Sequence, residues 1–304
     1  MNSPLHTEWV DTCKRFSDYD YVLLHLSELH HEFETILSEP NGPLLVESGI
    51  ALFAYLADAI SDDRQNVFEI WHGVKIGYPN DRHSDLFAPF FDVSRTQLLW
   101  SNATTNLQTL SPEIQAEIIL NILFRWNIIT MELMRKILSY CAYCQSHIDG
   151  QFDVNQHNNR LYGTGDPARY LRNTGNHKRS VAATRFYDPS LRHAIAHGNV
   201  FLALPNLVAV RYSFRNPNRF VQKEFDVQND KTAIDKIMSE FHEQADSCFQ
   251  TIRVFFFIYS MIDKQFGQLL SESWPKGLQN VLFSVMIDKT QSDPDGLHFW
   301  SNAR

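Results

Sequence analysis

Apolar residues recur every three or four positions along most of this chain, which is the spacing of an amphipathic α-helix. The repeat covers a first block that ends at Pro40, a mostly buried helix over residues 44–60, a helix over 94–110 and a long helix over 111–147. The pattern therefore predicts a mainly α-helical fold, in which residues 1–110 form an extra N-terminal helical region.

Two clear helix starts lie after residue 110. Ser-Pro-Glu at 111–113 and Asp-Pro-Ser at 188–190 each combine a capping side chain with a proline in the first turn. The second start predicts a short helix over 189–203, and a last long helix is predicted over 230–266. We treat residues 111–304 as one helical domain.

Three segments interrupt the helical pattern. Residues 61–92 are mixed, with glycine and proline as breaks. Residues 149–180 hold several glycines among asparagine and arginine, and they predict a long irregular connection. Apolar and polar residues alternate over about 206–227 on both sides of a turn sequence at 215–218, which predicts a small β-hairpin.

The composition indicates a soluble protein of the cytoplasm. The chain has 304 residues, of which 44% are apolar, enough for a sizeable core. Its four cysteines are too few for a disulfide framework, and its N-terminus has no secretory pattern. The longest strongly apolar stretch, 254–262, is far too short to cross a bilayer. We therefore expect a cytoplasmic protein with no membrane partner.

Positive charge gathers in one part of an acidic chain. The net charge is −8, yet residues 149–192 hold seven Arg or Lys against four Asp, a local charge of +3. Such a patch suits a phosphate backbone, and a solvated charged loop explains it equally well. The candidate RNA-binding residues are Arg169, Arg172, Lys178, Arg179 and Arg185.

Aromatic residues lie among these cations, at Tyr162, Tyr170, Phe186 and Tyr187. They can stack on the bases of single-stranded RNA, or they can pack onto the helical bundle. The sequence favours neither alternative.

A Cys-x-x-Cys pair lies near the end of the long helix. Cys141, Cys144 and His147 can share one helical face, but a zinc site normally has four ligands and no second pair is in range. Buried cysteine is common in protein cores. We therefore assign these residues to the core and expect neither a metal nor another cofactor.

The strongest chemical signal is the six-residue stretch from Arg192 to His197. It places a guanidinium, which binds anionic phosphate, near an imidazole, which transfers protons close to neutral pH. Positions five apart lie about 140° apart around a helix, so the two side chains meet only if the arginine swings round or a second copy of the chain completes the site. His193 and His197 lie on one face.

Each motif residue also has an alternative structural interpretation. His197 precedes Gly198, a typical helix-stop residue, and it can satisfy the last carbonyls of its helix. Arg192 can pair with Asp188 one turn earlier. Taken together, the two residues favour catalysis.

An arginine, a polar residue and a histidine at this spacing resemble the Rx4–6H motif of HEPN-domain ribonucleases. The order of elements over about 111–266 is similar too, with a long helix, the motif helix, a strand insertion and a long closing helix. The resemblance implies a HEPN-like helical bundle with a β-hairpin insertion. It also implies a homodimer in which the two motif helices face each other across a cleft.

The resemblance implies an activity as well. Many HEPN proteins are metal-independent endoribonucleases in which the RNA 2′-hydroxyl attacks its own phosphate, and they are common among toxins and anti-phage effectors that cut tRNA or mRNA. His197 would act as general acid or base, Arg192 would stabilise the phosphorane, and His193 would orient the phosphate. Asn199 stands where toxins silenced by adenylylation carry a tyrosine, so that regulation is not expected, although a protein inhibitor or antitoxin remains an implied partner.

Two other functions fit the sequence. A HEPN-like module can bind RNA, a nucleotide or a protein without cleavage, and a helical adaptor need not bind nucleic acid at all. Tight RNA binding without cleavage would favour the first, and motif residues buried in the core would favour the second.

Overall fold

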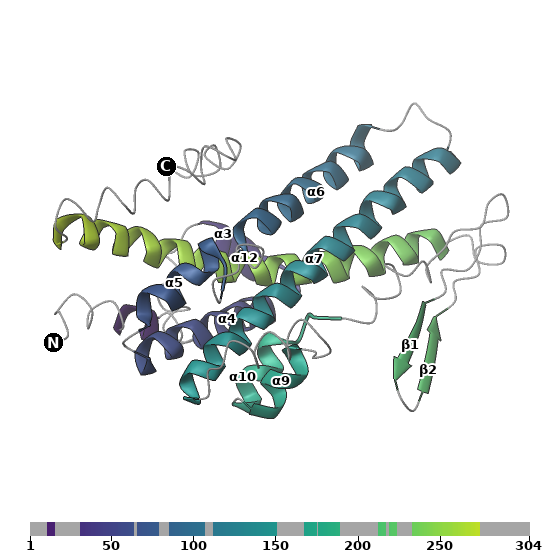
Figure 1. The fold of residues 1–304 in the computed structure, drawn as a ribbon. Coiled ribbons are helices and arrows are strands. Elements are labelled where there is room, and N and C mark those ends of the chain that lie inside the picture. Colours follow the sequence, from purple (N-terminus) through teal and green to yellow (C-terminus); the bar gives the residue numbers. More distant parts are fainter. Residues whose placement is uncertain are drawn as a thin grey trace.

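The computed structural model of the protein is mainly helical (Figure 1). It describes residues 11–15, 31–63, 66–78, 85–106, 112–150, 167–174, 176–188, 212–216, 219–223 and 233–273. The helices are α3 (His31–Ser38), α4 (Gly42–Asp62), α5 (Val67–Ile76), α6 (Phe87–Asn106), α7 (Pro112–Ile148), α9 (Pro167–Thr174), α10 (His177–Ala183) and α12 (Ala233–Ser273).

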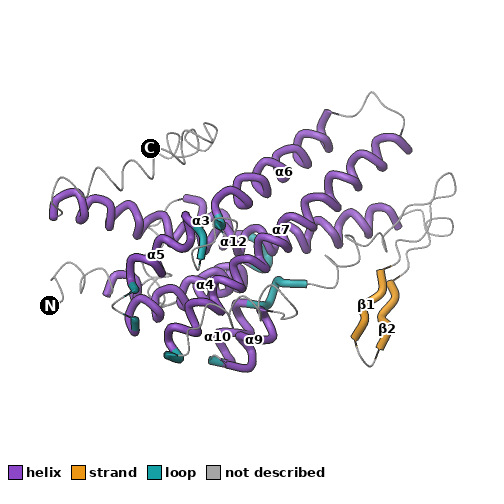
Figure 2. Tube along the Cα trace, viewed as in Figure 1, coloured by secondary structure: helices purple, strands orange, loops and turns teal. Residues whose placement is uncertain are grey.

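Two short strands accompany the helices (Figure 2). Strands β1 (Tyr212–Asn216) and β2 (Arg219–Lys223) are antiparallel, and Phe214 lies opposite Val221 in their register. They fall within the range of the expected hairpin. That the pair is an insertion into a HEPN-like bundle stays a prediction.

Helix α4 is the central element of the described fold. It packs against α3, α5, α7, α10 and α12, so its neighbours cover it on several sides (Figure 1). Most of its side chains from Leu45 to Ile60 are buried, and a helix that is apolar all round belongs in a core. The prediction of a mostly buried helix over 44–60 is confirmed.

The composition of α4 corrects one expectation. The helix from Gly42 to Asp62 is long and apolar enough to cross a membrane, so residues 254–262 are not the longest apolar stretch. Inside the structure, however, 78% of its apolar window is buried. Packing among other helices therefore accounts for the apolar character of α4.

Two long helices extend this centre. Helices α7 and α12 pack against each other and against α4, and α6 packs along α7. Buried Asn127 on α7 links this helix to α12, because its Nδ2 donates to the carbonyl of Phe241 at 2.9 Å. The same Nδ2 also donates to the carbonyl of Leu123 within α7, at 3.0 Å. Buried residues from both sides of residue 110 belong to one hydrophobic cluster.

Helix α7 matches its predicted range closely, whereas α12 and α6 differ from theirs by up to seven residues at one end. Helix α7 spans 112–148 against an expected 111–147, and α12 begins three residues later and ends seven residues later than expected. Helix α6 begins at Phe87, seven residues before the predicted start.

The prediction of an irregular connection over 149–180 is wrong for part of its length. Helix α9 lies within it, and α10 begins within it at His177. Pro167 suits the first position of α9, and the side chain of Asn176 caps α10 by accepting from the backbone N–H of Arg179 at 3.3 Å. Helices this short depend on tertiary packing, which here comes from α7 and α4.

The mixed segment 61–92 also contains a helix. Helix α5 occupies its middle, and Gly77 ends that helix with φ of 92°, a conformation that favours glycine. Gly77 therefore marks the end of α5, whereas Gly73 lies inside that helix and Pro89 lies in the first turn of α6.

Gly49 provides a test of the α4–α12 packing. A Cβ atom at this position would lie 2.4 Å from Cβ of Val254 and 2.9 Å from the carbonyl oxygen of Thr251. We expect Gly49→Ala to lower the free energy of unfolding by about 2 kcal/mol in urea titrations, because overpacking exceeds the helix propensity gained by alanine.

The matched control is Gly73→Ala on α5, where the closest atoms to an added Cβ lie 3.3 Å away. Gly73→Ala should lower the free energy of unfolding clearly less than Gly49→Ala does. Equal or greater stability of Gly49→Ala than wild type would contradict the close approach of the two helices.

Candidate functional site

The three predicted catalytic residues, Arg192, His193 and His197, lie outside the described residues, as does the predicted motif helix over 189–203. The turn that leads toward them, residues 184–188, is described.

This turn is fastened to the helical core. Arg185 Nη1 donates to Glu47 Oε2 on α4 at 2.6 Å, and Gln244 Nε2 on α12 donates to the carbonyl of Phe186 at 3.4 Å. Tyr187 is buried in the hydrophobic cluster. The chain therefore reaches residue 188 from a turn that is tied to both α4 and α12.

Three of the five predicted RNA-binding cations have partners within the protein. Arg179 Nη1 lies 2.5 Å from Asp58 Oδ2, and its guanidinium lies 5.3 Å from the centre of the Tyr55 ring. Arg185 pairs with Glu47, while Arg172 donates from Nε and Nη2 to the hydroxyl of Thr184 at 3.1 and 2.9 Å.

The other two predicted cations, Arg169 and Lys178, are exposed. Within the described ranges, neither side chain has an ion pair or a hydrogen-bond partner. Among the described residues, two of the five cations therefore form ion pairs, Arg172 is bonded to a neutral hydroxyl, and Arg169 and Lys178 have no partner.

The aromatic residues near these cations pack inward. Tyr170 and Phe186 pack against the hydrophobic cluster, and Tyr187 belongs to it. Tyr162 lies outside the described residues. For the three described rings, packing onto the helices is the alternative that the structure supports.

The assignment of the Cys-x-x-Cys pair to the core is confirmed. Cys141 and Cys144 are 1% and 0% exposed, and burial raises the pKa of both thiols well above the usual range. In the part of the chain that the structure describes, no group of three His, Cys, Asp or Glu side chains is placed to hold a metal ion.

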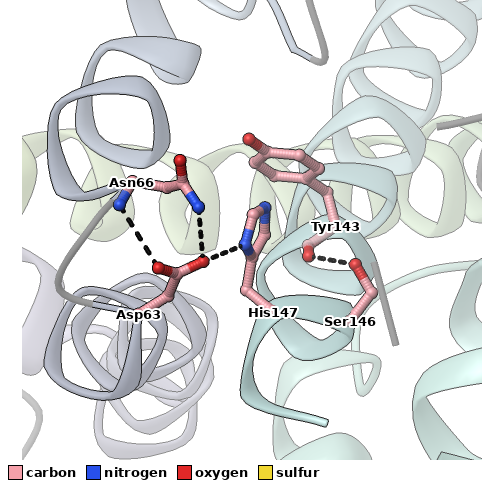
Figure 3. Close-up of polar contacts among 5 residues, drawn as sticks. All are labelled: Asp63, Asn66, Tyr143, Ser146 and His147. Atoms are coloured by element: carbon pink, nitrogen blue, oxygen red, sulfur yellow. Dashed lines mark hydrogen bonds and ion pairs between the residues drawn. The ribbon is translucent and has the colours of Figure 1, made fainter. Parts of the chain in front are cut away.

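His147, at the end of α7, forms a polar cluster with the residues that follow α4 (Figure 3). Its Nδ1 lies 2.7 Å from Oδ2 of Asp63, and the side chain is 4% exposed. The backbone N–H and the side-chain amide of Asn66 also donate to Asp63, at 3.2 and 2.9 Å. The ring of Tyr143 meets the imidazole edge to face, with centroids 4.7 Å apart.

The charge of Asp63 depends on these donors. Partial burial alone would raise its pKa, but hydrogen bonds from Asn66 and His147 outweigh burial and lower the pKa below the usual value. The carboxylate is therefore ionised at neutral pH and only accepts, so Nδ1 of His147 carries the proton between them.

The pair resembles the orienting half of an acid–base dyad, in which a carboxylate fixes an imidazole. Its Nε2, however, is enclosed by the fold, so no substrate reaches it. We interpret the cluster as a clamp that joins the end of α7 to the α4–α5 connection. Sequence reasoning missed Asp63 because it lies 84 positions from His147, and no local spacing links the two residues.

A second polar cluster joins α5 to α12. Asp263 accepts from Trp71 Nε1 at 2.9 Å and forms an ion pair with Lys75, and Trp71 stacks on Tyr259 with ring centroids 4.4 Å apart. Burial lowers the pKa of neighbouring His72 to about 4, with a further lowering from Lys75 and an opposing effect of Asp263. His72 is therefore neutral at neutral pH.

Comparison of the chain with protein-family models, with curated proteins and with solved structures returned no match. The functional interpretation therefore depends on the residues of this chain and on the contacts described above.

The Asp63 clamp generates a stability prediction. Asp63→Asn removes the charge that His147 and Asn66 stabilise, and we expect it to lower the free energy of unfolding by about 1 kcal/mol at pH 7. Because the folded state lowers the pKa of Asp63, its contribution is present above the usual carboxyl pKa and is lost as the pH falls through the folded value. The difference from wild type should therefore disappear in acid.

Asp62→Asn is the matched control, since it removes an adjacent exposed carboxylate. Urea titrations at several pH values give the measurement. If Asp62→Asn lowered the free energy of unfolding as much as Asp63→Asn, the result would argue against the clamp.

His72 generates a second pH prediction. Its pKa is about 4 in the folded state and about 6.5 in an unfolded chain, so unfolding takes up a proton between these values. The free energy of unfolding should therefore be unaffected by His72 above pH 6.5. As the pH falls from 6.5 to 4, protonation of His72 in the unfolded chain should lower it by ~3 kcal/mol at most. In His72→Gln, urea midpoints should therefore depend less on pH over this window than in wild type.

Exposed His177→Gln serves as the reference variant, and it should keep the wild-type pH dependence. An unchanged pH dependence in His72→Gln would show that burial of this imidazole does not control acid stability.

Proposed function

We propose that this protein is a HEPN-type, metal-independent endoribonuclease. The RNA 2′-hydroxyl attacks the adjacent phosphorus and loses its proton to a base, and the bond to the 5′-oxygen breaks as that oxygen receives a proton. The products are a 2′,3′-cyclic phosphate and a 5′-hydroxyl. His197 acts as general acid or base, Arg192 stabilises the charge of the phosphorane, and His193 orients the phosphate.

One sequence observation carries the proposal. Arg192, His193 and His197 stand at HEPN spacing, between a long helix that precedes them and a long helix that follows them. Arg172 and His177 repeat the same spacing, but they lie on two different short helices, α9 and α10.

The packing of the described helices supports the proposal. Helices α7 and α12, which flank the motif in sequence, lie against each other and are joined by the hydrogen bond from Asn127 to Phe241. The turn before the motif is tied to α4 through Arg185 and to α12 through Gln244.

The proposal includes an assembly and a role. The protein acts as a cytoplasmic homodimer, with the two motif helices across a cleft, and it cuts tRNA or mRNA as a toxin or anti-phage effector. It requires no cofactor, and a protein inhibitor or antitoxin is its expected regulator.

RNA cleavage in EDTA tests the proposal. Wild-type protein incubated with total RNA should produce fragments with 2′,3′-cyclic phosphate ends. His197→Ala and Arg192→Ala should each slow cleavage by about 100-fold or more, because general acid–base and electrostatic stabilisation contribute at least that much. Exposed Arg95→Ala on α6 is the matched control and should cleave like wild type.

RNA with 2′-O-methyl groups lacks the nucleophile and should stay intact. Cleavage of that RNA, or equal cleavage by His197→Ala and wild type, would refute the mechanism. Tight RNA binding with no cleavage would instead identify a non-catalytic HEPN-like module.

A further inference from the structure

Helices α9 and α10 form a small unit, residues 167–187, with an unusual charge. It contains five Arg or Lys and no Asp or Glu. The two helices pack against each other, α9 packs on α7, and α10 packs on α4. In a chain with net charge −8, this unit concentrates positive charge on one part of the core.

Two of the five cations attach the unit to α4. Arg179 pairs with Asp58 and Arg185 pairs with Glu47, at 2.5 and 2.6 Å, and each side chain is about three-quarters covered. Arg179 also lies over the ring of Tyr55, which adds a cation–π contact. These two charges are neutralised inside the protein.

Three positive charges remain without a counter-ion in the described part of the chain. Arg169 and Lys178 are exposed and have no partner among the described residues. Arg172 is held by the hydroxyl of Thr184, which is a neutral acceptor and leaves the guanidinium charge uncompensated. The unit therefore presents uncompensated cations on a scaffold that two ion pairs fix in place.

We infer that the exposed face of the α9–α10 unit binds the phosphate backbone of RNA through Arg169, Arg172 and Lys178. Arg179 and Arg185 instead hold the unit on α4. The inference rests on the proposed ribonuclease function, which makes RNA the polyanion, and it divides the five candidate cations into contact residues and docking residues.

The distribution of apolar side chains favours RNA over a membrane surface. Tyr170, Leu171, Phe186 and Tyr187 are packed in or against the core, and Val181 is the large apolar residue that the described unit exposes, at 43%. A membrane-bound helix needs a continuous apolar face, which this unit lacks. A phosphate backbone needs only cations and hydrogen-bond donors.

Binding of a short 2′-O-methyl RNA, followed by fluorescence anisotropy across a salt series, tests the inference. This RNA cannot react through a 2′-hydroxyl, so binding is measured apart from cleavage. In Arg169→Ala/Lys178→Ala the affinity at low salt should fall about tenfold, and the slope of log Kd against log salt should decrease by about 1.4, because two phosphate contacts are lost.

The controls separate contact from docking. Arg95→Ala removes an exposed arginine on another helix and should keep the wild-type slope. Arg169→Lys/Lys178→Arg keeps both charges and should bind like wild type. Arg179→Ala should lower the thermal midpoint yet leave the slope unchanged below that temperature, since its charge already has a partner.

Several outcomes would overturn the inference. They are an unchanged slope in Arg169→Ala/Lys178→Ala, a reduced slope in folded Arg179→Ala, or wild-type binding to phosphatidylglycerol vesicles but not to RNA. The proposed function fails separately: if wild type binds this RNA through Arg169 and Lys178 but does not cleave ordinary RNA, the surface stands and the nuclease does not.

Discussion

The described structure depends on the burial of α4. An apolar helix is stable in water only when other elements cover most of its surface, and α3, α5, α7, α10 and α12 do so for α4. The absence of a side chain at Gly49 lets α12 approach closely. Helices α7 and α12 both lie on α4, and this arrangement brings them into contact with each other. The turn at 184–188 is positioned by α4 as well, because Arg185 donates to Glu47 on that helix.

The same helix organises the charges of the protein. Its acidic residues Glu47 and Asp58 lie at the edge of the buried face, and each takes one arginine from the α9–α10 unit. Ion pairs at such partly exposed positions contribute little to stability, but two of them with one helix fix an orientation. The positive charge of the α9–α10 unit therefore has two parts, one paired with α4 and one without a counter-ion among the described residues.

Periodicity predicted the long helices because α7 and α12 carry many turns of consistent pattern. It failed for α5, α9 and α10, whose stability comes from distant contacts that no local window contains. The candidate site divides in the same way. Arg192 and His197 stay a prediction from their spacing and the order of the flanking helices. The partners of Arg179 and Arg185 lie more than a hundred positions away and could not be predicted from the sequence.

Burial also limits which histidines can perform acid–base chemistry on RNA. His147 is enclosed and oriented by Asp63, and burial keeps His72 neutral beside the Trp71–Asp263 contact. An imidazole that transfers a proton to or from RNA must reach the 2′- or 5′-oxygen, and neither of these two can. The enclosed positions of His147 and His72 therefore do not suit that role. In the proposed mechanism the acid–base role belongs to the histidines of the Arg192–His197 motif, which follow a turn anchored to two core helices.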